Sequence, residues 1–252
     1  MNFFQELRRR NAMLFYLGMF CVLGAATCLA CIYLTNTQVL GINAFIKPSK
    51  FFLSIAIITL TLAWLLYYLD NQKAVRRYSR ATIVAMLIEL VIITEQAARG
   101  QRSHFNNSPA LNGILFGVMG ASITVFTCWT AYMCWLFFKQ KKFSIKESYL
   151  WGIRLGLLCF VAFAAEGFVI VHNGGHTVGA PDGGSGLPYL NWSTGYGDLR
   201  AAHFFGMHSL QILPILGYFF LNNKKSVIAI AIIYFAAVSL LLLEALNARP
   251  LI

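Results

Sequence analysis

The sequence predicts an all-α, polytopic membrane protein: a single domain that forms a bundle of seven transmembrane helices. Its residues are 58% apolar and only 12% charged, whereas about a quarter of the residues in soluble domains are charged. Apolar runs of about 20 residues, the length needed to cross the hydrocarbon layer, recur along the chain. Lys and Arg are almost confined to the connections between these runs, and connections rich and poor in them alternate.

Seven apolar runs have the length of a transmembrane helix. The expected helices cover residues 11–34, 51–70, 81–98, 114–138, 151–171, 201–221 and 227–248. The first run follows MNFFQELRRR and resembles a signal peptide in its charge. It is longer than the apolar core of a signal peptide, which has about 7–15 residues. The sequence therefore predicts that it stays in the protein as the first helix.

The distribution of basic residues predicts the orientation of the helices. With seven crossings, 14 of the 20 Lys and Arg residues fall on the side of the N-terminus. The other side receives Lys47, Lys50, Arg99, Arg102, Arg200 and Arg249. Short cytoplasmic loops carry the excess of positive charge. We therefore expect a cytoplasmic N-terminus and an external C-terminus, in a plasma (inner) membrane.

The same pattern excludes other interpretations of the basic composition. The net charge of +11 does not indicate a nucleic-acid partner, because a basic footprint for DNA gathers on one face of the fold. Membrane lipids are the expected partners.

All six cysteines lie inside apolar runs, so the sequence predicts no disulfide framework.

Histidines gather on the predicted outer side. Four of the five lie between Val171 and Pro214, and the fifth, His104, lies in the connection between the third and fourth helices. The connection over residues 172–200 is long and rich in glycine and contains Asp182. Irregular connections of this length are usually functional lids or are disordered. The stretch therefore predicts a site beneath a lid.

Four acidic residues lie inside predicted helices, and such residues usually face the bundle interior and have a function. They are Glu89, Glu95, Glu166 and Glu244. At ~1.5 Å per residue, the last three lie ~6–9 Å below the outer helix ends. His203 and His208 share that layer, whereas Glu89 is near the midplane. The sequence thus predicts an outer layer of imidazoles and carboxylates.

Helical geometry limits how this layer can be arranged. His203 and His208 are five residues apart and point about 140° away from each other, so they do not chelate one ion from one helical face. His208 shares a face with Gln211. A structural interpretation also stays open, in which His208 is a core residue bonded to Glu166 or Glu244 and His203 faces the outer loop. Glu95 can likewise be only the helical partner of Arg99.

The first chemical hypothesis is a metal-dependent membrane enzyme, a hydrolase or an oxidoreductase, that acts on a lipid or a small apolar substrate. Zinc and non-haem iron bind mixed sets of histidines and carboxylates. The candidate metal ligands are His203, His208, His104, His172 and Glu166. The candidate catalytic carboxylates are Glu95, Glu166 and Asp182, the last of them from the lid.

Three alternatives remain open. His203 and His208 can be cofactor ligands of one b-type haem near the outer side. The buried glutamates and the histidines can form a protonatable path in a proton-coupled transporter or channel. A non-catalytic seven-helix binding protein explains the topology without the layer of acids.

Overall fold

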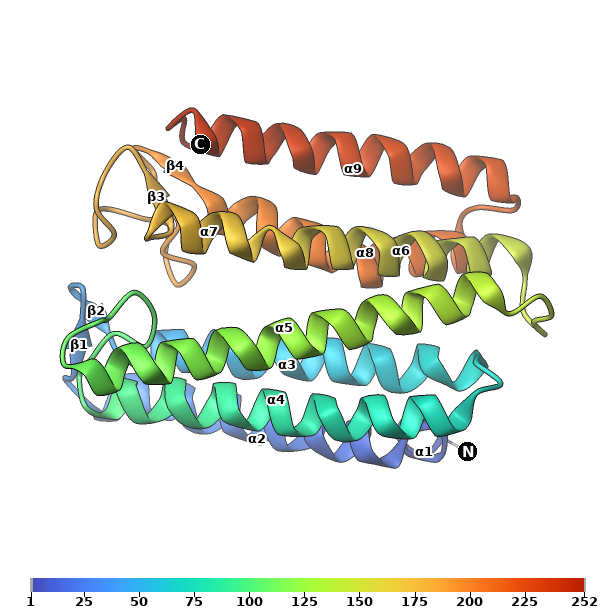
Figure 1. Ribbon diagram of the computed structural model, residues 1–252, viewed down its shortest axis with the longest axis horizontal. Coiled ribbons are helices and arrows are strands. Elements are labelled where there is room, and N and C mark those ends of the chain that lie inside the picture. Colours follow the sequence, from blue (N-terminus) through green and yellow to red (C-terminus); the bar gives the residue numbers. More distant parts are fainter. Residues whose placement is uncertain (1, 252) are drawn as a thin grey trace. The chain divides into compact units, whose positions relative to one another are not determined.

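A computed structural model describes residues 2–251 of the chain, and its elements are almost all helical (Figure 1). Within these residues, six helices are long and apolar enough to cross a membrane. The chain is therefore a multi-pass α-helical membrane protein. It divides into two compact units, with the boundary between Trp129 and Thr130, inside helix α5. We describe each unit by itself.

Unit 1 contains the helices from the N-terminal end to the first two thirds of α5. Its elements are α1 (Phe3–Arg10), α2 (Ala12–Leu34), β1 (Gln38–Val39), β2 (Ile42–Asn43), α3 (Ile46–Leu65), the 3-10 turn η1 (Leu66–Tyr68), α4 (Gln72–Ala98) and α5 (Ala110–Lys139). Strands β1 and β2 pair antiparallel. Figure 1 shows α2, α3 and α4 running lengthwise, with this hairpin and the α4–α5 connection at one end.

Polar caps fix the helix starts in unit 1. Asn2 and Gln5 form a reciprocal capping box at the start of α1, a short helix that the sequence interpretation did not predict. The side chain of Asn11 accepts a hydrogen bond from the Leu14 N–H and starts α2 as a separate helix. Asn71 does the same for α4 through Ala74. These caps satisfy N–H groups that a helix start leaves without a partner.

Unit 2 contains the end of α5 and all later elements. They are α6 (Glu147–Ala165), α7 (Gly167–Asn173), β3 (Thr177–Val178), β4 (Gly197–Asp198), α8 (Leu199–Phe219) and α9 (Lys224–Leu246). Strands β3 and β4 pair antiparallel and join the two ends of the long connection. We call residues 174–198 the lid. In Figure 1 the lid lies at one end of α6, α8 and α9, and the α8–α9 turn lies at the other.

The predicted apolar segments are helical, and several predicted boundaries were wrong. Helix α3 begins at Ile46 instead of 51 because Pro48 is tolerated in a first helical turn. Helix α4 begins at Gln72 instead of 81 and carries its basic residues within the helix. The predicted helix 151–171 begins at Glu147 and is interrupted at Glu166, which separates α6 from α7.

The seventh predicted span, α8, differs from the others. It has 21 residues, which is long enough to cross a membrane, but it is not among the six apolar spans found within residues 2–251. Its sequence contains Arg200, His203, His208 and Gln211, which lower its hydropathy. The polar residues that exclude α8 from the apolar set are also those that make it a candidate for function.

Candidate functional site

The main polar contact of unit 2 joins the break between α6 and α7 to the first turns of α8. Glu166 Oε2 lies 2.9 Å from His203 Nδ1. Gly167 lies beside the imidazole, since a Cβ built there would be in ordinary van der Waals contact with His203 Cε1 at 3.7 Å. Of the predicted site residues, Glu166 and His203 lie in contact. The sequence predicted that both belong to the same layer of the bundle.

The two side chains differ in exposure. The Glu166 side chain is 3% exposed and the His203 side chain 27%. Glu166 Oε1 is buried and has no hydrogen-bond partner among the described residues. With Glu166 ionised, the His203 Nδ1–H donates to the carboxylate and the Nε2 lone pair is left for another group. Such a carboxylate fixes the orientation and the tautomer of its imidazole.

The immediate surroundings of this pair are apolar. Phe163, one turn before Glu166, packs with Ala202 and Val238 in a buried cluster. Gly206 lies directly against the Phe163 ring, and a Cβ at this position would overlap with that ring. The ring of Phe235 lies 5.3 Å from the same phenylalanine. An apolar wall strengthens the electrostatic contact between the carboxylate and the imidazole because it excludes water.

Close packing of α6 on α8 holds the pair in register. A Cβ built on Gly156 would lie 2.8 Å from the Ser209 carbonyl oxygen. The hydroxyl of Ser209 donates to the Gly156 carbonyl at 3.0 Å, and Ser148 donates to the Gly217 carbonyl at 2.7 Å. Small residues let membrane helices approach closely, and hydroxyls then bond across the interface. The contact therefore fixes where Glu166 meets α8.

The lid is organised by two aspartates. Asp182 accepts hydrogen bonds from the backbone N–H groups of His176 and Thr177, at 3.0 and 2.9 Å, and lies 2.7 Å from His176 Nδ1. Burial raises the pKa of the Asp182 carboxyl, but these donors outweigh it and hold that pKa well below its usual range. Asp182 was predicted as a catalytic residue, and in the structure its contacts close a turn of the lid.

Asp198 joins the lid to α8. It is 3% exposed, caps the helix, and accepts hydrogen bonds from the Ser193 N–H at 2.8 Å and from the Arg200 guanidinium at 2.8 and 2.5 Å. Arg200 also donates to the Asn191 carbonyl at 2.5 Å. The buried Trp192 packs on Phe204, with the ring centroids 5.5 Å apart. The lid is thus tied to α8 by an ion pair and an aromatic contact.

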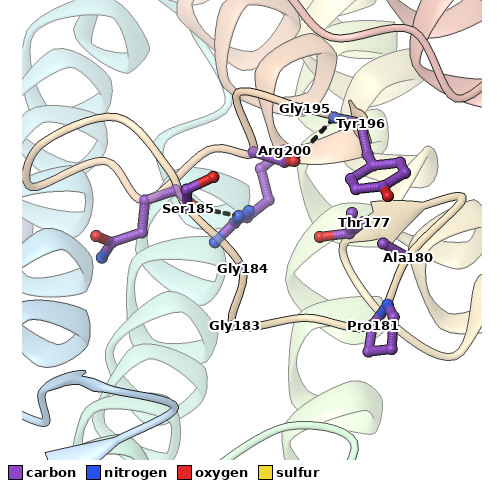
Figure 2. Close-up of a pocket in the computed structure, with 11 residues that line it drawn as sticks. Thr177, Ala180, Pro181, Gly183, Gly184, Ser185, Gly195, Tyr196 and Arg200 are labelled. Atoms are coloured by element: carbon purple, nitrogen blue, oxygen red, sulfur yellow. Dashed lines mark hydrogen bonds between the residues drawn. The ribbon is translucent and has the colours of Figure 1, made fainter.

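A cavity of about 140 Å³ lies within the lid. Figure 2 shows Arg200 extending toward the loop at Gly183 to Ser185, with Tyr196 and Thr177 on the other side. Hydroxyl groups, glycine backbone and one guanidinium line it together with Ala180, Pro181 and Tyr196, so the lining is mixed polar and apolar. Arg200 and His203 are three residues apart on α8, so Arg200 begins about one helical turn closer to the N-terminus of α8 than His203, ~4.5 Å along the axis. His203 itself does not line the cavity.

Two other predicted histidines of unit 2 are not joined to this pair. His208 Nδ1 lies 3.1 Å from Gln211 Oε1, as their shared face predicted, and its ring packs on Phe204 with centroids 4.3 Å apart. The alternative in which His208 bonds to Glu166 or Glu244 was therefore wrong. His172 lies exposed at the end of α7.

The remaining predicted acids and His104 have local partners. Glu95 forms the helical ion pair with Arg99 at 2.9 Å, and its side chain is 46% exposed. This pairing confirms the simpler interpretation of Glu95. Glu244 likewise pairs with Arg249 at 3.1 Å. His104 lies in an aromatic cluster of unit 1, 5.4 Å from Phe116 between ring centroids.

The predicted metal-ligand set does not assemble in the structure. Within residues 2–251, no three His, Cys, Asp or Glu side chains lie close enough to hold a metal ion. Of the candidate ligands, His208 contacts Gln211, His104 lies in the aromatic cluster of unit 1 and His172 is exposed at the end of α7. What remains is the pair of Glu166 and His203.

From the sequence, Arg200 was expected only as a charge that indicates topology, and Asp198 was not singled out. Their order, Asp-Leu-Arg directly before a helical segment, is the signature of a helix cap and was the available signal. No protein-family model, curated protein or solved structure matches this chain. The functional argument therefore depends on the geometry of the site.

Proposed function

We propose that the chain is a membrane-embedded enzyme in which Glu166 and His203 form an acid–base pair on the outer side of the membrane. The observation that carries this proposal is the 2.9 Å contact between a carboxylate that is 3% exposed and an imidazole that is 27% exposed. A buried carboxylate bonded to a partly exposed imidazole is the arrangement that prepares histidine for proton transfer.

In this proposal the two residues have different roles. Glu166 is a positioning residue: it holds Nδ1 and stabilises the imidazolium that forms when Nε2 takes a proton. His203 is the catalytic residue, because its Nε2 is the atom left for substrate. A base of this kind contributes typically 10²- to 10⁴-fold to the rate. The reaction class is hydrolysis or oxidation.

The surroundings favour an amphiphilic substrate, a lipid or another apolar molecule with a small polar group. Phe168 and Phe205, close in sequence to Glu166 and His203, are 61% and 36% exposed and offer an apolar surface to hydrocarbon. The lid cavity beside Arg200 offers hydroxyls, backbone groups and a guanidinium to a polar group. A substrate held at both points has its linking bond near His203.

The proposal includes a topology. Helix α8 is taken as the seventh span because it packs closely on α6. Its glycines lie against α6, and its Ser209 hydroxyl donates a hydrogen bond to α6, so neither needs water. Seven crossings and the excess of Lys and Arg in the alternate connections put the N-terminus in the cytoplasm and the lid outside. The proposed location is the plasma (inner) membrane of a bacterium, with the lid facing the periplasm or the exterior.

The test is a product assay in vesicles made from a total lipid extract of bacterial membranes. Purified wild-type protein is compared with His203→Asn, Glu166→Gln and the exposed-histidine control His172→Asn, and lipid products are followed by mass spectrometry. We expect the wild type and the control to form the same product, and His203→Asn to form it at least about 100-fold more slowly. An unchanged rate in His203→Asn contradicts the proposal.

The same purified protein tests the metal-dependent form of the enzyme. His203 and Glu166 would supply two ligands, or an imidazole ligand and the carboxylate that orients it. Stoichiometric zinc or iron that is lost in His203→Asn, without a Soret band, supports a metal-dependent enzyme. A Soret band supports the haem alternative. Full activity of protein free of both supports acid–base chemistry by the pair alone.

A further inference from the structure

Helix α4 of unit 1 carries a line of buried polar side chains along one face. Thr82, Glu89 and Gln96 are 1%, 2% and 1% exposed. They are spaced seven residues apart, so they lie on one stripe of the helix, ~10.5 Å apart along the axis. Glu89 is the deepest acid of this unit. Neither the acid–base pair of unit 2 nor the packing of the apolar core accounts for this stripe.

Each of these three side chains has an unsatisfied oxygen. Thr82 Oγ1, Glu89 Oε1 and Gln96 Oε1 are buried and have no hydrogen-bond partner among the described residues. A buried polar atom without a partner destabilises the fold, and more than 90% of buried polar groups have a partner in native proteins. Three on one stripe therefore indicate a common partner. Internal water is the molecule that bonds to isolated buried polar groups.

The line reaches the outer end of the helix through a chain of amides. Gln96 Nε2 donates to Asn112 Oδ1 at 2.8 Å, and Asn112 Nδ2 donates to Gln101 Oε1 at 3.0 Å. Asn112 is 2% exposed, whereas Gln101 is only partly buried. The amide chain thus connects the buried stripe to the surface of the α4–α5 connection.

At the opposite end the line continues to Ser79 and Asn11. Asn11 Nδ2 donates to Ser79 Oγ at 2.9 Å, and Asn11 lies at the junction of α1 and α2. From Ser79 to Gln96 the helix rises ~25 Å, compared with a hydrocarbon thickness of about 30 Å. Polar atoms therefore follow α4 across almost the whole membrane.

The charges that face Glu89 are few. Lys47, in the first turn of α3, is the cation within Coulombic range of its carboxyl group. Helix α2 and the part of α5 in unit 1 contain no Asp, Glu, Lys, Arg or His. The other charged residues of α4 are its basic N-terminal residues and the exposed pair of Glu95 and Arg99. Glu89 is therefore the single carboxyl group in the middle of the line.

We propose that unit 1 conducts protons along this face of α4, through internal water, with Glu89 as the proton-binding group halfway across. The Glu89 carboxylate takes one proton from the water chain on one side and becomes a carboxylic acid. It then releases that proton to the water chain on the other side. Only O–H bonds form and break, and one positive charge crosses the membrane per cycle. The proposal does not depend on the acid–base pair of unit 2.

The experiment uses purified full-length protein in sealed lipid vesicles that contain the pH-sensitive dye pyranine. A potassium gradient with valinomycin supplies the membrane potential, and the initial rate of internal pH change is measured. We expect the wild type to exceed empty vesicles at least tenfold, and Glu89→Gln to lower the protein-dependent rate at least tenfold. Glu244→Gln, which changes a glutamate of a span that is exposed and paired with Arg249, is the matched control and keeps the wild-type rate.

Two further variants separate conduction from folding. Thr82→Val and Gln96→Leu leave Glu89 in place but remove polar atoms on either side of it, so each is expected to slow conduction. Infrared difference spectra of the wild type between high and low pH should show a carboxylic-acid band that is absent in Glu89→Gln. A wild-type rate equal to that of empty vesicles, or a Glu89→Gln rate equal to that of the wild type, overturns the proposal.

Discussion

Glu166 Oε2 and His203 Nδ1 lie 2.9 Å apart although the residues are separated by 37 positions, and the whole lid lies between them in the sequence. The contact couples the α6–α7 break to the start of α8. One partner is buried and the other is partly exposed. Among the described residues, this is the one polar contact of either side chain, so each depends on the other.

This contact predicts a measurable coupling in stability. Glu166→Ala and His203→Ala each remove one partner and leave the other without it, whereas the double variant leaves neither. Leaving a buried carboxylate without its hydrogen-bond donor costs about 1–3 kcal/mol. We expect the double variant to lose less unfolding free energy than the sum of the single losses, by about 1 kcal/mol. Unfolding in mixed detergent micelles measures all three, and additive losses would contradict a direct contact.

The lid is expected to loosen in acid because of Asp182. The folded pKa of its carboxyl lies below the ordinary value, which is about 3.9 in unfolded chains. A depressed carboxyl pKa stabilises the folded state at pH values above the unfolded pKa, and this stabilisation is lost as the pH falls from there toward the folded pKa. Loss of lid structure is therefore expected below about pH 4.

Hydrogen exchange of peptides from residues 174–198, corrected for the intrinsic pH dependence, measures this effect. The matched control is Asp182→Asn, which keeps the shape of the side chain but does not titrate. We expect its lid to exchange faster than that of the wild type at pH 6 and to show little further change in acid. Wild-type protection that stays constant between pH 6 and pH 3 would contradict the role of the carboxylate.

That the chain is a multi-pass helical membrane protein could be predicted from the sequence, because it depends on the length and hydropathy of the apolar runs, whereas the count of seven helices and their orientation stay predictions. The pairing of Glu95 with Arg99 and that of His208 with Gln211 followed in the same way from the helical repeat. The depth of Glu166 in the membrane stays a prediction from the rise per residue, and the structure adds its contact with His203. Contacts between neighbours on one helix could therefore be predicted from the sequence.

Which side chains of different helices come into contact depended on packing between helices and could not be predicted. Which face of α6 meets α8 is decided by glycines such as Gly156 and Gly206, whose neighbours are distant in sequence. Within residues 2–251 the predicted metal ligands do not form a group of three, because depth alone does not specify rotation about a helix axis. Helix starts were misplaced because polar caps, such as Asn71 and Asp198, begin helices outside the apolar runs.

The orientation of the chain, and the crossing by α8, can be tested by cysteine labelling. In a background without the six native cysteines, single cysteines are placed in exposed connections at Ser185, Lys141 and Asn222. An impermeant maleimide is expected to label Ser185→Cys in intact cells, and the other two only after lysis, because the positive-inside rule puts them in the cytoplasm. Labelling of Asn222→Cys in intact cells would show that α8 does not cross the membrane.

The final prediction concerns the packing that positions His203. A Cβ built on Gly152 of α6 would lie 2.5 Å from the Leu213 carbonyl oxygen and 2.9 Å from Pro214 Cα, so it meets backbone that cannot rotate away. In Gly152→Ala the helices α6 and α8 must separate, and overpacking of this kind costs about 1–3 kcal/mol. A lower unfolding temperature in detergent is the expected result.

Gly120→Ala is the matched control, because Gly120 also lies inside a helix but a Cβ there has no neighbour within 4 Å. This change relieves the entropic cost of glycine, about 0.5–1 kcal/mol, and should leave the unfolding temperature equal or raise it. Opposite changes in the unfolding temperature are informative, because both substitutions raise helix propensity by the same amount and differ only in the backbone next to the new methyl group. Equal shifts in the two proteins would mean that α6 and α8 are not in close backbone contact at Gly152.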